Sequence, residues 1–149
     1  MPLEKRLGAG DFSELASRAD IVLDCSDNFA TRHALNRACV QQKKPLVSGA
    51  AIRFDAQLMV FDLSRADSPC YSCLFPEEAE VEEVQCSTMG VLAPLTGIVG
   101  ALQAAEAIKL LTGIGESLAG RLVMLDAKGG EWRKVKVAKD PSCAVCGRP

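Results

Sequence analysis

The first third of the chain alternates short apolar runs with longer stretches of mixed polarity. Residues 21–23 and 45–48 are apolar runs of strand length, which are typical of buried strands in a parallel sheet. Residues 29–42, which lie between them, predict a helix. Strand, helix and strand at this spacing predict a βαβ unit with a right-handed crossover. A further short helix is expected over residues 11–19, ahead of the first strand.

The remainder of the chain has longer elements. We expect a strand at 56–63 that is antiparallel to its successor, a polar loop at 64–83, an apolar helix at 94–112 and two strands at 121–126 and 131–138. Gly113 ends the helix, and Lys128-Gly129-Gly130 is a hairpin connection between the last two strands. The pattern therefore predicts an α/β fold that combines parallel and antiparallel strands.

Composition narrows the class of protein. With 149 residues, of which 48% are hydrophobic and 24% charged, the chain is expected to form one globular domain. The net charge of −2 favours neither nucleic acid nor a membrane surface as a partner. Residues 91–111 are apolar but include Thr96, Gln103, Glu106 and Lys109, so we expect a helix buried in protein and no membrane span.

Cysteine usage indicates the redox compartment. The N-terminus has no apolar leader of the kind that directs export, and the cysteine count of seven is odd. A reducing cytoplasm explains this pattern more simply than a disulfide framework does. We therefore expect a cytoplasmic protein whose thiols are free or metal-bound.

Two Cys-x-x-Cys pairs are the most specific chemical signal. Cys70 and Cys73 form one pair, Cys143 and Cys146 form the other, and both lie in loop-like contexts. Four thiolates complete a tetrahedral Zn²⁺ site that has no open position for a substrate. The alternatives are four unrelated thiols or a dithiol redox pair, and the redox pair is weakened because neither motif opens a helix after a strand. We expect one structural zinc that ties the C-terminal tail to the middle of the chain.

The second signal is the loop after the first predicted strand, Asp24-Cys25-Ser26-Asp27-Asn28. Loops beyond the carboxyl ends of parallel strands bind nucleotides in doubly wound folds. Two carboxylates at such a place suit Mg²⁺ on a triphosphate, because Mg²⁺ prefers hard oxygen ligands. The alternative is that Asp27 caps the following helix, and the local sequence by itself favours this alternative.

Three other residues have a chemical or packing role to assign. Cys86 precedes the long predicted helix, where it is either an activated nucleophile or sulfur carrier, or a buried inert thiol; the local sequence favours neither. His33, the single histidine, is expected to be a surface or packing residue and no base or ligand. Trp132 is expected to pack in the core.

The motifs taken together resemble the C-terminal portion of the HesA/MoeB/ThiF family, the bacterial relatives of ubiquitin-activating enzymes. The segments that carry the resemblance stand in the family's order and are 24–32, 45–53, 70–74, 86–91, 103–109 and 143–147. The run 47–53 is most similar to the MoeB-type molybdopterin-synthase adenylyltransferases, with the ThiF proteins of thiamine synthesis next. The resemblance implies a Rossmann-like fold of the ThiF type.

The resemblance also implies an activity and a set of site residues. Family members use Mg-ATP to adenylate the C-terminal Gly-Gly carboxylate of a small ubiquitin-like sulfur-carrier protein, and they are typically homodimers. Asp27 matches the family's Mg²⁺/ATP aspartate, which reverses the local preference for capping, and Asn28 beside it joins the cofactor-binding set. The Cys-x-x-Cys residues match its structural zinc ligands. Cys86 matches a cysteine that carries covalent chemistry in some branches.

One departure from the family pattern concerns the phosphates of ATP. Family members begin with a glycine-rich nucleotide loop after a first strand, whereas Gly8-Ala9-Gly10 has no strand before it and lacks the further glycine. We therefore expect residues 1–149 to be the C-terminal portion of such a domain, in a truncated or fragment form that does not exchange ATP by itself. The alternative function is a non-catalytic, zinc-stabilised module that binds a sulfur carrier or a full-length homologue.

Overall fold

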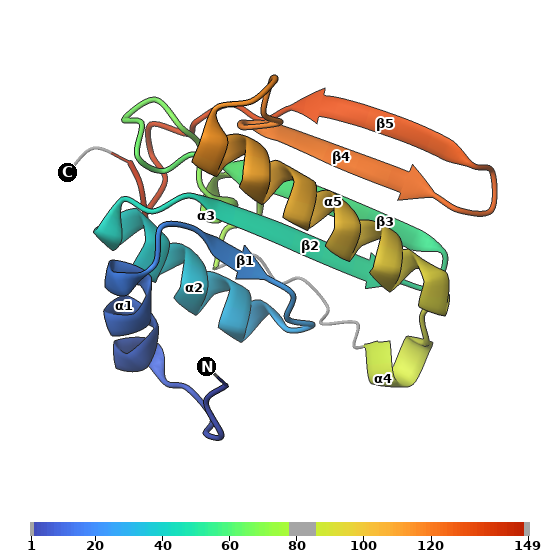
Figure 1. Ribbon diagram of the computed structural model, residues 1–149, viewed down its shortest axis with the longest axis horizontal. Coiled ribbons are helices and arrows are strands. Elements are labelled where there is room, and N and C mark those ends of the chain that lie inside the picture. Colours follow the sequence, from blue (N-terminus) through green and yellow to red (C-terminus); the bar gives the residue numbers. More distant parts are fainter. Residues whose placement is uncertain (1, 78–85, 148–149) are drawn as a thin grey trace.

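The protein is described by a computed structural model that covers residues 2–77 and 86–147, without the side chains of residues 86 and 87. The helices are α1 (Ala9–Arg18), α2 (Phe29–Gln42), α3 (Tyr71–Leu74), α4 (Cys86–Met89) and α5 (Ala93–Thr112). The strands are β1 (Val22–Asp24), β2 (Leu46–Ile52), β3 (Asp55–Phe61), β4 (Arg121–Asp126) and β5 (Glu131–Lys136). Figure 1 shows them arranged around a single mixed sheet.

The sheet runs in the order β1-β2-β3-β4-β5. Strand β1 is parallel to β2, and the pairs β3–β4 and β4–β5 are antiparallel, as the sequence predicts. Strands β2 and β3 also pair antiparallel, which the sequence did not predict. Strand β1 pairs Asp24 with Ser48 and ends there, while β2 continues to Ile52. Within residues 2–77 and 86–147, the second half of β2 therefore has no strand beside it on the β1 side, and this is where the candidate site lies.

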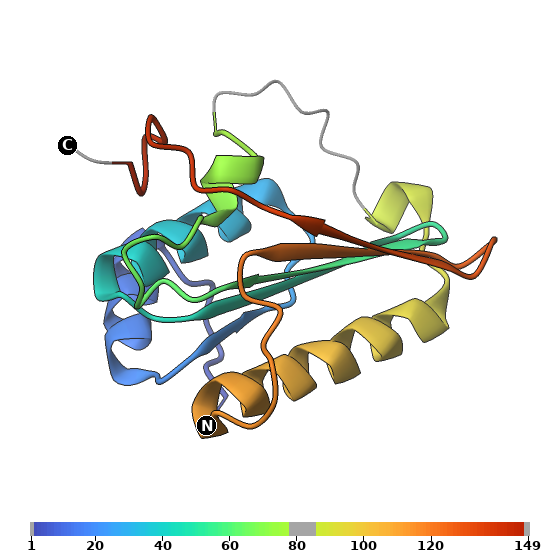
Figure 2. The same cartoon turned by 90° about the horizontal axis from the view of Figure 1, so that it is seen from above.

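Helices cover both faces of the sheet. Helix α5 packs on β2 and β3 on one face, whereas α2 packs on β1 and β2 on the other, with α1 and α3 against α2. Figure 2 shows this layering with the sheet seen nearly edge-on. The β4–β5 hairpin extends past the helices, so its outer strand has little cover.

The buried side chains form clusters on the two faces. On the α2 side the cluster consists of Cys39, Leu46, Met59, Phe61, Leu63, Cys70, Tyr71 and Cys143. On the α5 side the buried residues are Ala56, Leu95, Val99 and Leu125 in one cluster and Val47, Leu58 and Val60 in another. Two of the predicted metal ligands thus belong to the core itself, which ties the tail to the sheet.

Local signals account for the helix boundaries. Asn28 is the N-cap of α2, and its Oδ1 accepts a hydrogen bond from the backbone N–H of Thr31 at 2.8 Å. Helix α5 has a proline in its first turn and ends at Gly113, which adopts the left-handed conformation at φ 71°. By length and composition alone α5 is apolar enough to cross a membrane, a test that the core helices of other proteins also pass.

Two expectations about individual elements need correction. The second strand is longer than predicted, since it runs from Leu46 to Ile52 and forms a hairpin with β3. Trp132 does not pack in the core: it is 53% exposed on β5, the uncovered edge strand. An edge strand with one neighbour offers a large ring only part of the cover that a central strand would.

Candidate functional site

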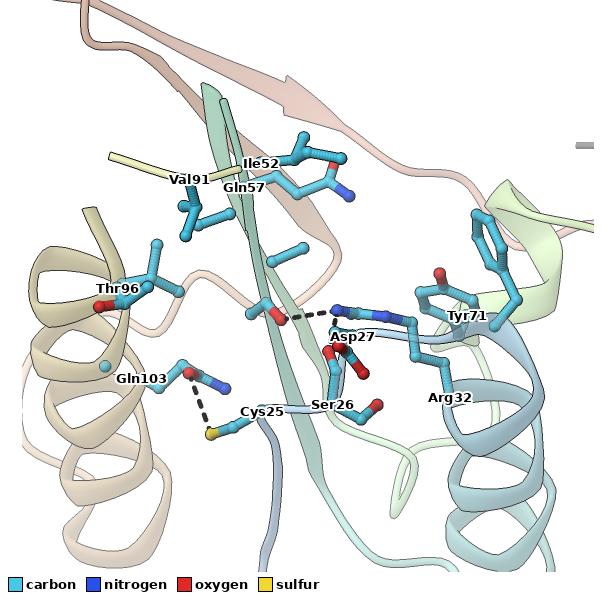
Figure 3. Close-up of a pocket in the computed structure, with 16 residues that line it drawn as sticks. Cys25, Ser26, Asp27, Arg32, Ile52, Gln57, Tyr71, Val91, Thr96 and Gln103 are labelled. Carbon is cyan, nitrogen blue, oxygen red and sulfur yellow. Dashed lines mark hydrogen bonds between the residues drawn. The ribbon is translucent and has the colours of Figure 1, made fainter. Parts of the chain in front are cut away.

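A cavity of about 530 Å³ opens where β1 ends and β2 continues. The residues around it come from the β1–α2 loop, α2, β2, β3, α3, the α4–α5 connection and α5 (Figure 3). They are Cys25, Ser26, Asp27, Phe29, Arg32, Gly49, Ala50, Ala51, Ile52, Gln57, Tyr71, Val91, Thr96, Val99, Gly100 and Gln103. This is the carboxyl edge of the parallel pair, where doubly wound sheets bind their ligands.

Asp27 lies in the loop after β1, and its exposed side chain lines the cavity. The N-cap of α2 is Asn28, so the alternative that Asp27 caps this helix is wrong. The amide Nδ2 of Asn28 lies 3.5 Å from Oδ1 of Asp27, which is a long contact. The carboxylate of Asp27 is thus placed as predicted, at the cavity. Its role toward Mg²⁺, and that of Asn28 toward a nucleotide, stay predictions.

A buried ion pair lies directly behind this loop. Asp24 is 1% exposed, and its carboxylate accepts hydrogen bonds from Ser26 Oγ at 2.7 Å and Ser48 Oγ at 2.9 Å. Arg32 approaches the same carboxylate at 3.6 Å and donates to Ser48 Oγ at 3.1 Å. It also donates to the backbone carbonyls of Ser26 and Gly49. The buried charges of Asp24 and Arg32 therefore offset each other, and both side chains have hydrogen-bond partners.

Gln103 reaches the same point from α5, on the opposite face of the sheet. Its Nε2 donates to the carbonyl oxygens of Asp24 at 2.9 Å and Val47 at 3.1 Å. Its Oε1 accepts a hydrogen bond from the Cys25 thiol at 3.4 Å. This close approach needs glycine at position 49, because a Cβ there would lie 2.5 Å from Gln103 Oε1.

Tyr71 closes the cavity on the α3 side. It is 1% exposed and packs edge-on against His33 at 5.3 Å between ring centroids. Burial raises the pKa of Tyr71 to about 12, although the positive charge of Arg32 acts in the opposite direction. His33 is buried among these rings, which confirms it as a packing residue.

The two Cys-x-x-Cys pairs meet in space. The four Sγ atoms of Cys70, Cys73, Cys143 and Cys146 all lie within 4.8 Å of one another. Sγ of Cys70 is 3.7 Å from that of Cys143, and Sγ of Cys73 is 3.4 Å from that of Cys146. Tetrahedral Zn–S bonds of about 2.3 Å place sulfurs roughly 3.8 Å apart, so the cluster is compatible with a zinc site.

The surroundings of the sulfurs also suit a metal. Backbone N–H groups of Cys70 and Asp140 point at Cys73 Sγ from 3.5 and 3.4 Å, and Asn36 Nδ2 lies 3.5 Å from Cys70 Sγ. Such donors stabilise thiolates. Burial raises the pKa of the Cys70 thiol to about 11, so a bound cation is what would keep it deprotonated near neutral pH.

Comparison with known proteins agrees with this geometry. The sequence model of the ThiF family matches residues 1–145. The chain belongs to the ThiF family. It is 44% identical over 150 residues to the molybdopterin-synthase adenylyltransferase of Escherichia coli, and 44% identical over 145 residues to the sulfur carrier protein ThiS adenylyltransferase of the same organism. These matches cover 99% and 97% of this chain.

A solved structure shares the fold of this chain, and the similar proteins are longer than it. The ATP-bound crystal structure of Escherichia coli MccB superposes with a TM-score of 0.74 over 98% of this chain and 45% of that chain, at 19% identity, which establishes the shared fold. The chain spans 58% and 57% of the two adenylyltransferases.

Cys86 is the first residue of α4, but its side chain lies outside the described part of this ThiF-family chain. Whether it meets the cavity or carries covalent chemistry stays a prediction.

No role for Arg32, Gln103 or Tyr71 was predicted from the sequence, although all three line the same cavity as Asp27. A signal was present for Gln103, because a polar residue inside an otherwise apolar helix needs hydrogen-bond partners. Arg32 follows Asn28 by one helical turn and lies within the family motif, but its partners are backbone carbonyls that only the fold brings near.

Proposed function

We propose that this ThiF-family chain takes part in the ATP-dependent adenylation of the C-terminal Gly-Gly carboxylate of a ubiquitin-like sulfur carrier. The observation that carries the proposal is the position of Asp27. Its carboxylate does not cap α2, and it lines a cavity at the carboxyl edge of the parallel strands. Relatives at 44% identity are adenylyltransferases that serve molybdopterin synthase and the sulfur carrier ThiS. The carrier for this chain belongs to the same chemical class.

In the proposed reaction, a carboxylate oxygen of the carrier's last glycine attacks the α-phosphorus of ATP. An O–P bond forms, the bond from that phosphorus to the oxygen bridging to the β-phosphorus breaks, and pyrophosphate leaves with the electron pair. Asp27 would hold Mg²⁺, which would supply positive charge to offset the negative charge of the triphosphate. Asn28 beside it remains the other proposed nucleotide contact.

The shape of the cavity supports an extended, small-residue substrate. One wall is the uncovered half of β2, Gly49-Ala50-Ala51-Ile52, which has no large side chain before Ile52. A chain end that carries two glycines can approach such a backbone closely, because neither partner has bulk to keep them apart.

We propose that the Cys70, Cys73, Cys143 and Cys146 cluster holds one Zn²⁺ in a structural role. Four sulfur ligands leave no position for a substrate, and Cys70 and Cys143 belong to the core on the α2 side. The zinc would thus hold the tail and α3 in place without taking part in the reaction.

We also infer that the chain forms a homodimer. Helix α5 and the turn after it expose Ile98, Ile108, Leu111 and Ile114, at 40%, 58%, 56% and 68%. Several exposed large apolar side chains on one helix and the turn after it are typical of a surface that a partner covers.

One observation favours a second candidate, a zinc-stabilised module without catalysis of its own. Among the described residues, Arg32 is the one cation that lines the cavity, and its guanidinium is bonded to Ser26, Ser48 and Gly49. Phosphoryl chemistry needs preorganised donors on the phosphates. Such a module would bind the carrier while another chain or segment supplies those donors.

Exchange of labelled pyrophosphate into ATP distinguishes the adenylation function from the non-catalytic module. We propose to assay residues 1–149 alone, and joined to the glycine-rich N-terminal part of the Escherichia coli molybdopterin-synthase adenylyltransferase, each with a carrier that ends in Gly-Gly. The proposal predicts carrier-dependent exchange in the joined form and none with a carrier that lacks the last two glycines. Carrier binding without exchange in the joined form would favour the non-catalytic module.

A further inference from the structure

The segment from Asp24 to Ser26 leaves the sheet, because the hydrogen bonds between β1 and β2 do not continue beyond Asp24. Strand β1 ends at Asp24, and the hydrogen-bond ladder to β2 ends with it. The next residues must still keep Asp27 at the cavity. Within the described residues, the carboxylate of Asp27 accepts one long side-chain hydrogen bond, from Asn28 Nδ2 at 3.5 Å. The position from which its carboxylate enters the cavity therefore depends on how the backbone before it is held.

Two buried side chains replace the missing ladder, one from each face of the sheet. From α2, Arg32 Nη2 donates to the carbonyl of Ser26 and, at 3.1 Å, to that of Gly49. From α5, Gln103 Nε2 donates to the carbonyls of Asp24 and Val47. Each nitrogen thus bridges the β1 side to β2, which is what a ladder hydrogen bond would do. Figure 3 shows the loop between these two side chains.

Burial makes this arrangement costly to rearrange. Arg32 is 7% exposed and Gln103 is 2% exposed. The guanidinium is paired with Asp24, so a movement of Arg32 would leave a buried carboxylate without its counter-charge. A movement of Gln103 would leave carbonyls of both strands without a donor. These groups consequently have one well-defined arrangement.

We propose that Arg32 and Gln103 are positioning residues that clamp residues 24–26 from both faces of the sheet and so direct the Asp27 carboxylate into the cavity. The inference rests on the proposed function for the meaning of that direction, but the clamp itself is a property of the fold. Neither side chain needs to touch the nucleotide. Lysine in place of Arg32 keeps the charge but loses the planar fork that reaches two carbonyls.

The order of the loop can be measured without any activity. Cys25 is exposed and lies inside the clamped segment, and its thiol donates a hydrogen bond to Gln103. We propose to measure its alkylation by iodoacetamide, resolved by peptide mass spectrometry, together with amide hydrogen exchange of residues 25–28. The variants are Arg32→Lys and Gln103→Leu. The matched controls are Arg37→Lys and Gln41→Leu, whose parent residues are exposed on α2.

The clamp predicts that Arg32→Lys raises the alkylation rate of Cys25 about fivefold to tenfold, and that both variants speed amide exchange of the loop by a similar factor. The controls should leave both rates unchanged. Zinc content and melting temperature report the whole fold. If Arg32→Lys does not fold, Ser48→Ala, which removes one hydroxyl partner of Arg32, takes its place. Unchanged rates in the folded variants overturn the clamp.

A second readout connects the clamp to the reaction. In the joined form described above, the variants should raise the Mg²⁺ concentration for half-maximal pyrophosphate exchange several-fold, an effect that a general loss of folded protein would not produce. A parent that shows no exchange refutes the proposed function, and the loop measurements then decide the clamp by themselves. An opened loop with normal Mg²⁺ dependence overturns the positioning role.

Discussion

Gly49 is the residue whose replacement the site can least accommodate. A Cβ at this position would lie 2.5 Å from both Val99 Cγ1 and Gln103 Oε1, so α5 would have to move away from β2. We expect Gly49→Ala to lower the free energy of unfolding by about 1–3 kcal/mol, measured by urea denaturation. The control is Gly97→Ala on α5, where a Cβ would meet nothing within 4 Å. Equal stability of Gly49→Ala and the parent would contradict this packing.

Tyr71 provides a test of burial beside the cavity, because it is the single tyrosine of the chain. Its folded-state pKa of about 12 lies above the ordinary value of 10.0, since burial disfavours the phenolate. Stability from the neutral phenol is therefore complete below pH 10 and is lost as the pH rises toward 12. We expect the tyrosinate absorbance near 295 nm to appear about two pH units later than in urea-unfolded protein. Ionisation of the folded protein near pH 10 would show that the ring is open to water.

Individual site residues differ in how far the sequence could predict them. The position of Asp27 and the cysteine cluster follow from short motifs, whose members lie near one another in sequence or repeat a fixed spacing. The capping alternative failed because Asn28, one residue later, takes that role. The roles of Arg32 and Gln103 depend on backbone carbonyls that come together only when both faces of the sheet are covered.

Helix α3 and the C-terminal tail are brought together by the cysteine cluster, and α2 is hydrogen-bonded to α3. Asn36 on α2 accepts a hydrogen bond from the backbone N–H of Tyr71 and donates to Ser72 Oγ, at 3.0 and 3.1 Å. Tyr71, one of the two residues between the proposed zinc ligands Cys70 and Cys73, thus also lines the cavity. Loss of the metal should consequently destabilise the whole fold.

We expect close to one zinc per chain in protein purified without chelator, and little in Cys143→Ser. Because metal binding contributes directly to folding, the melting temperature of this variant should fall by roughly 10 °C or more. Cys25→Ser is the matched control, since Cys25 is an exposed thiol outside the cluster. Full zinc content and an unchanged melting temperature in Cys143→Ser would refute the metal site.

Elements with a strong internal pattern were predicted well, and those defined by their neighbours were not. The apolar helix and the C-terminal hairpin lie within two residues of their predicted bounds. Strand β2 was cut short because Gly49-Ala50-Ala51 has little strand propensity, yet it pairs along its length with β3. Trp132 was misplaced because nothing in the local sequence shows that its strand lies at the edge of the sheet.

The exposed side of α5 determines the expected assembly of the whole molecule. A charge at its most exposed large side chain should oppose burial of this face against a second copy, and within the helix that residue is Ile108, at 58%. We expect a dimer at micromolar concentration in analytical ultracentrifugation, and a shift toward the 15.9 kDa monomer in Ile108→Glu. Ser64→Glu, in an exposed loop, is the control. A stable monomeric parent would refute the dimer.

Pyrophosphate exchange in the Asp27→Asn variant tests the account most directly. The substitution keeps the size of the side chain and removes the charge that would hold Mg²⁺. In the joined form with a Gly-Gly carrier, we predict that exchange falls roughly 100-fold or more, while zinc content and melting temperature stay at the parent values. Exchange at the parental rate in a correctly folded Asp27→Asn variant would contradict the account, because the cavity would then not be organised around this carboxylate.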